Sequence, residues 1–155
     1  MKRFTSLILC ALLLLSVIPH VSASETRPQD VGEVIYSSKY LTNDGITVID
    51  EVVALNQTRS TDKTYYRSKS FYDGDTLIAF IKFEATFRYD GRTVTVISKT
   101  VTDTDTYASW SYVQNSFTSS GGTVTLSGKL TKWLIFNSPF TMTLSCDING
   151  NISYT

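Results

Sequence analysis

Alternation of apolar and polar residues, strict between positions 81 and 88, is the feature that most constrains the fold. This two-residue period places the apolar side chains on one face of a pleated strand, and a helix does not accommodate it. A half-buried β-strand is therefore predicted, and a second apolar layer must cover its face. That face consists of Leu77, Ala79, Ile81, Phe83, Ala85 and Phe87.

The dipeptide Asp90-Gly91 follows this strand directly and predicts a two-residue type I′ hairpin turn. A strand over 92–101 then returns antiparallel, with Phe87 opposite Val94. A slip of one residue would mix the two faces, so the apolar pattern specifies the register.

Several other segments are rich in β-branched and aromatic residues and lie between turn residues. Strands are predicted over 46–55, 64–72, 107–117, 123–136 and 140–148, with a polar link over 102–106 and a turn over 137–139. Gly128 predicts a bulge or bend, and residues 33–36 favour a short strand or turn over a helix.

About seven strands without an amphipathic helix predict an antiparallel β-sandwich, with a small up-and-down β-barrel as the alternative. A parallel βαβ fold is excluded because it needs crossover helices. We expect one domain over 46–155, preceded by a lead-in segment over 24–45.

The first 23 residues have the pattern of a signal peptide. Lys2 and Arg3 precede an apolar run over 7–18, and Val21-Ser22-Ala23 fits a cleavage site after Ala23. The alternative is an uncleaved anchor, but the run is shorter than the roughly 20 residues of a membrane span. We therefore expect a secreted, extracellular protein.

Cleavage would shorten the 155-residue chain by 23 residues, to 132. Of the 14 basic residues 12 would remain against 14 acidic ones, a net charge of −2, which does not favour nucleic acid. His20 and Cys10 would be lost, leaving Cys146 as the one cysteine and no histidine. Histidine-based catalysis, histidine-ligated metals and a disulfide within the chain are thereby excluded, and no enzyme, metal site or cofactor is predicted.

Aromatic side chains are the best candidates for a binding site. Trp133 falls on the polar side of its predicted strand, and an exposed ring on a β-sandwich can stack against a sugar. The predicted aromatic surface consists of Trp133, Trp110, Tyr112 and Tyr65. The alternative is that these rings pack across strands inside the fold.

Three segments also carry a resemblance: SSKYLTNDG at 37–45, SFYDG at 70–74 and SFTSSGG at 116–122. In these the chain resembles small exported all-β proteins of Gram-positive gut bacteria. The resemblance implies a bacterial source and transfers no functional residue, because such proteins have no assigned activity.

We therefore expect a secreted, non-enzymatic module that binds a cell-surface glycan or protein. The alternative is a bacteriocin-like or toxin-like protein whose Ser/Thr-rich strands rearrange into a membrane barrel, and only this alternative involves a membrane.

Overall fold

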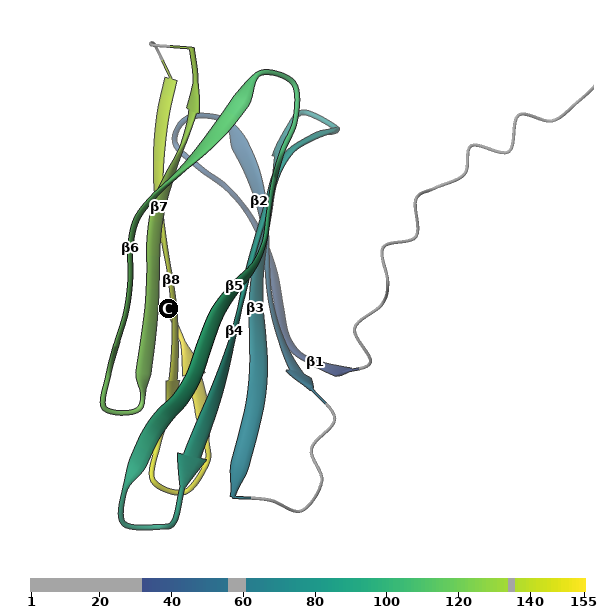
Figure 1. Ribbon diagram of the computed structural model, residues 1–155. Coiled ribbons are helices and arrows are strands. Elements are labelled where there is room, and N and C mark those ends of the chain that lie inside the picture. The colour runs from purple at the N-terminus through teal and green to yellow at the C-terminus, as the bar shows by residue number, and fades with distance from the viewer. Residues whose placement is uncertain (1–31, 56–60, 134–135) are drawn as a thin grey trace, which may run out of the picture.

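The computed structural model describes residues 32–55, 61–133 and 136–155, which form nine strands in two antiparallel sheets (Figure 1). The larger sheet contains β1 (Gly32–Leu41), β2 (Ile46–Leu55), β3 (Asp62–Asp73), β4 (Thr76–Tyr89) and β5 (Val94–Thr106) in that order. The smaller contains β6 (Trp110–Ser120), β7 (Thr123–Lys132), β8 (Phe136–Cys146) and β9 (Ile152–Tyr154). The predicted sandwich is confirmed, and the sheets do not close into a barrel.

Each strand pairs with its neighbour in the chain, so each sheet is a meander, and the step from β5 to β6 passes from one sheet to the other. Residues 1–31, and with them the predicted signal peptide, lie outside the described part. Within the described ranges no helix has the length and hydropathy to cross a membrane.

The core lies between the two inner faces, as the alternation in β4 predicts. Phe83 and Phe87 are completely buried there, against a layer of smaller apolar side chains from the other sheet. Burying one side chain of this size contributes about 1.5–3 kcal/mol. The opposing layer contains Val124, Leu126, Leu130, Met142 and Leu144.

The predicted register of the β4–β5 hairpin is wrong by two residues. Phe87 lies opposite Val96, and the turn has four residues because Tyr89 pairs with Val94. The carboxylate of Asp90 explains the wider turn, since its Oδ1 accepts hydrogen bonds from the main-chain N–H groups of Arg92 (2.8 Å) and Thr93 (2.7 Å). Next to the turn this shift of two leaves Val94 and Val96 on the predicted core face. A bulge between Thr86 and Phe87 then pairs Thr86 with Ser98, so the faces of β5 are the reverse of the prediction from Ser98 onward.

Other boundaries also differ from the prediction. The polar link over 102–106 belongs to β5, and β9 was not predicted. The strand expected from residue 107 begins at Trp110, and the bulge expected at Gly128 lies on the partner strand β6, between Gln114 and Ser116.

The turn predicted over 137–139 is instead part of β8. Thr143 exchanges main-chain hydrogen bonds with Thr155, on the outer side of β8. Alternation along the strand directs the main chain of Pro139 to the same outer side, where its missing N–H costs no ladder hydrogen bond. The proline therefore lies in the part of β8 that the short strand β9 does not cover.

Candidate functional site at one end of the sandwich

All non-glycine residues with positive φ in the described part of the chain lie at one end of the sandwich, the upper end in Figure 1. They are Ala108 (52°), Ser109 (67°) and Trp133 (51°). Pairing of Trp110 with Lys132 brings the start of β6 beside the end of β7, so these residues are neighbours in space. Backbone strain of this kind concentrates at functional sites.

Trp133 is the most exposed large hydrophobic residue of the described chain, with 74% of its surface accessible. The left-handed backbone costs a residue with a side chain about 1–2 kcal/mol. A bulky ring at such a position is held there by its surroundings, since neither burial nor backbone preference favours it. The prediction that Trp133 is exposed is confirmed.

Lys132 lies between two indole rings. Its position continues the inward alternation of Leu126 and Leu130, and its Nζ is 5.4 Å from the ring centroid of Trp110 and 5.7 Å from that of Trp133. Both distances suit cation–π attraction. The nearest carboxylate oxygen, from Asp73, is 3.9 Å away, at the outer limit of an ion pair.

Beneath this end, Trp110 is 5% exposed and packs edge-to-face on Phe136, with ring centroids 4.9 Å apart. Its Nε1 is buried and has no hydrogen-bond partner among the described residues. The hydroxyl of Tyr112, two residues further along β6, is also buried without a partner there, and burial raises the pKa of this tyrosine. A buried donor without an acceptor costs about 1–3 kcal/mol, so these two groups reduce the stability of this end of the sandwich.

The predicted aromatic surface is not formed as a whole, because only one of its four members offers an exposed ring. Trp110 and Tyr112 lie on the inner face of β6, and Tyr65 is buried on the inner face of β3, next to Phe87. For these three the alternative interpretation, packing inside the fold, is correct.

Sequence reasoning missed the roles of Lys132 and Asp73. The available signal was Lys132 itself, a cation that interrupts the apolar side of its strand. Such an interruption indicates either the end of the core or a charge that faces a specific partner. Here it does both.

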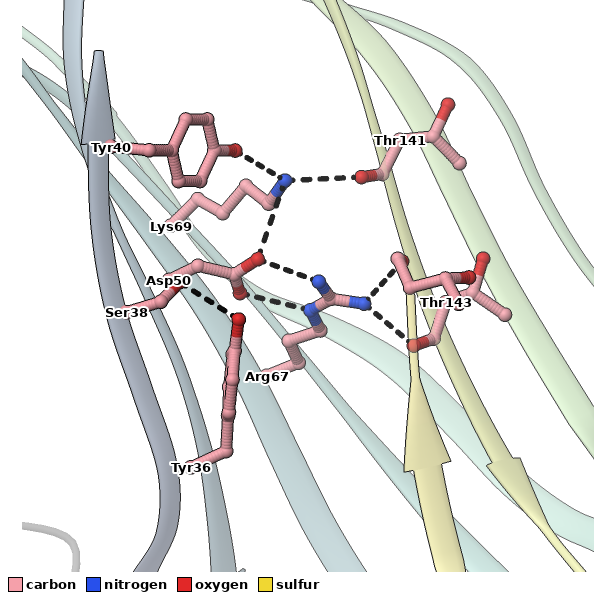
Figure 2. Close-up of polar contacts among 9 residues, drawn as sticks. Tyr36, Ser38, Tyr40, Asp50, Arg67, Lys69, Thr141 and Thr143 are labelled. Carbon is pink, nitrogen blue, oxygen red and sulfur yellow. Dashed lines mark hydrogen bonds and ion pairs between the residues drawn. The ribbon is translucent and has the colours of Figure 1, made fainter.

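A second polar cluster joins the two sheets and is drawn in Figure 2. Arg67 donates from Nε and Nη2 to the two carboxylate oxygens of Asp50, at 2.9 and 2.6 Å, and Lys69 Nζ lies 3.4 Å from the same carboxylate. All three side chains are buried. Bidentate geometry of this kind is the strong form of an ion pair.

The remaining donors of this cluster bond to the smaller sheet. Arg67 Nη1 donates to the main-chain oxygens of Thr143 and Thr155, both at 2.6 Å, and Lys69 Nζ donates to that of Thr141 at 3.2 Å (Figure 2). Because both cations are supplied with acceptors, the cluster stabilises the sandwich and offers little to a ligand.

The described part of the chain also contains one free thiol, that of Cys146. Burial raises the pKa of the Cys146 thiol, and the nearby Asp147 raises it further, so the thiol stays protonated at neutral pH. Within the described ranges, no group of three or more carboxylate, cysteine or histidine side chains is placed to hold a metal ion.

Comparison of the chain with protein-family models, with curated proteins and with solved structures gives no match. The function is therefore inferred from the geometry of the end that carries Trp133, Lys132, Trp110 and Asp73, here called the tryptophan end.

Proposed function

We propose that this chain is a secreted, non-enzymatic module that binds a glycan at the tryptophan end. The observation that carries the proposal is Trp133, an exposed indole on a strained backbone, with the partly exposed ammonium of Lys132 5.7 Å from its ring centroid. A protein gains nothing in stability from this arrangement. A ligand that covers the ring and supplies oxygen atoms would gain from it.

A sugar has the matching chemistry. One face of a pyranose ring carries C–H groups that stack on an indole, and its edge carries oxygen atoms that accept hydrogen bonds. Binding sites for such ligands combine an apolar surface with a few placed polar groups. Trp133 supplies the surface, and Lys132 supplies a donor next to it.

Export is part of the proposal and rests on the N-terminal sequence. Cleavage after Ala23 would release the domain outside the cell, where cell-wall and host glycans are found, and we propose a Gram-positive bacterium as the source. N-terminal sequencing of the protein from culture medium tests this directly. A chain that begins at Met1 and stays in the cytosol would contradict it.

Tryptophan fluorescence tests the binding itself. A glycan that stacks on Trp133 should shift its emission to shorter wavelength, while the buried Trp110 should respond little. We expect Trp133→Ala to abolish binding to any positive member of a glycan panel. Ile148→Ala is the matched control, because Ile148 is also exposed but lies in the β8–β9 turn.

The same preparations separate glycan binding from the alternative, membrane activity. Leakage of dye from liposomes without any glycan response would favour the membrane-active protein. A flat response across the panel, or equal binding by Trp133→Ala, would refute the proposed function.

A further inference from the structure

Lys132 is a poorly satisfied cation. Its ammonium donates no hydrogen bond to the described residues and has two ring faces and one distant carboxylate as neighbours. Its side chain is 30% exposed, so a ligand in solvent can reach it. An ammonium group has three N–H donors, and none of them bonds to a residue in the described part of the chain.

The contact between Lys132 and Asp73 is weak and replaceable. The 3.9 Å separation exceeds the 2.7–2.9 Å of a charge-assisted hydrogen bond, and the Asp73 side chain is 57% exposed. An exposed pair of this kind contributes little to stability. A second carboxylate could therefore take the place of Asp73 at little cost.

Resting on the glycan site proposed above, we infer that Lys132 selects glycans that carry a carboxylate, such as a uronic acid or sialic acid residue. The Lys132 ammonium lies over the Trp133 ring, 5.7 Å from its centroid, so a sugar stacked on that same face of the indole brings its carboxylate next to Lys132. Its carboxylate would accept the hydrogen bond that Asp73 does not reach. Lys132 is thus the residue that determines specificity.

Neighbouring turns limit which anions bind. Asp44 lies in the β1–β2 turn and Asp75 in the β3–β4 turn, both at the tryptophan end, since Ile46 pairs with Asp73. Their charges repel small anions. The carboxylate must therefore arrive on a sugar that is also held by the indole, and free acetate should not compete.

Matched pairs of sugars test this specificity by calorimetry on the processed protein. Suitable pairs are trigalacturonate with its methyl ester and sialyllactose with lactose. We expect the acidic member of the bound pair to bind about tenfold more tightly, and increasing salt to reduce that preference.

Variants of two lysines on β7 assign the preference. Lys132→Met should remove it while retaining weak binding of the neutral member, and Lys132→Arg should restore it. Lys129→Met removes the same charge three residues away, on the outer side of the strand, and should bind as the parent does. Asp73→Asn should raise affinity for the acidic member by two- to threefold. Thermal unfolding checks that each variant is folded.

The outcomes distinguish this inference from the proposed function. Equal affinity for both members of a pair, or an unchanged preference in Lys132→Met, would overturn the role of Lys132 and leave glycan binding intact. No binding to either member of either pair, together with a flat response across the wider panel, would overturn both.

Discussion

Arg67 of β3 donates a hydrogen bond from Nη1 to the main-chain oxygen of Thr143 in β8, at 2.6 Å, across the gap between the two sheets. The same nitrogen bonds to the main-chain oxygen of Thr155, so one guanidinium joins the larger sheet to two segments of the smaller. A buried cation can do this only while its charge is balanced, and Asp50 supplies that balance.

Asp50→Asn should therefore destabilise the fold strongly. It leaves the buried charges of Arg67 and Lys69 without an anion, and breaking a buried pair costs about 3–5 kcal/mol. Urea unfolding measures the loss. Asp62→Asn is the control, since it breaks the exposed pair with Arg88 and should change the stability far less. Similar losses for the two variants would contradict the importance of burial.

Replacing all three charges tests the same cluster from the opposite direction. Asp50→Leu, Arg67→Met and Lys69→Met together leave no buried charge unbalanced, and well-packed apolar replacements of a buried ion cluster are often neutral or stabilising. The triple variant should thus be more stable than Asp50→Asn alone. If it is less stable, the hydrogen bonds to β8 outweigh the cost of burying the charges.

Trp133→Gly should stabilise the protein relative to Trp133→Ala. Both variants remove the indole, but only glycine adopts a φ of 51° without strain. The expected difference is about 1–2 kcal/mol in the free energy of unfolding. Equal stability of the two variants would show that the chain relaxes at this position. Glycan binding should be lost in both.

Acid should destabilise the end of the sandwich opposite Trp133. Main-chain N–H groups of Thr93 and Arg92 lower the pKa of Asp90, and Asn151 lowers that of Asp147, both below the ordinary value of 3.8. A carboxyl group with a lowered pKa in the folded state stabilises the fold above its unfolded pKa. That contribution is lost as the pH falls below about 4 and through the folded value.

Urea midpoints measured from pH 6 to pH 2.5 test this dependence. The double variant Asp90→Asn, Asp147→Asn should lose less stability with acid than the parent. Superimposable pH profiles would show that other carboxylates dominate acid unfolding. Asp44→Asn, in an exposed turn, controls for loss of a surface charge.

Cys146 should report global unfolding. The thiol is buried and its pKa is raised, so a thiol-specific reagent at pH 8 should react only when the strand opens. The labelling rate should then rise with urea in parallel with the unfolded fraction. Fast labelling of the folded protein would indicate that β8 and β9 separate locally.

The fold could be predicted from the sequence because its signals are local. Alternation in β4 fixes which side chains enter the core, and two sheets are the simplest way to cover such faces. Turn lengths were less accessible, since the turn at Asp90 depends on where one carboxylate bonds. Pro139 can belong to β8 only because β9 does not extend along this part of the strand. No local sequence pattern reveals the length of a neighbouring strand.

The candidate site was only partly predictable for a related reason. Exposure of Trp133 followed from its polar neighbours, but burial of Trp110 and Tyr112 depends on which face of β6 meets the other sheet. The interaction of Lys132 with both indoles requires the start of β6 to pair with the end of β7. Such contacts join residues from different strands, and composition does not encode them.

The two meanders have a consequence for how the molecule assembles. Because within each sheet every strand pairs with the strand before it in the chain, each hairpin can form as soon as its second strand has been synthesised. The remaining step is then the docking of two preformed sheets. Rapid folding from one terminus would shorten the time during which a chain without a disulfide is unfolded and can be cleaved by proteases.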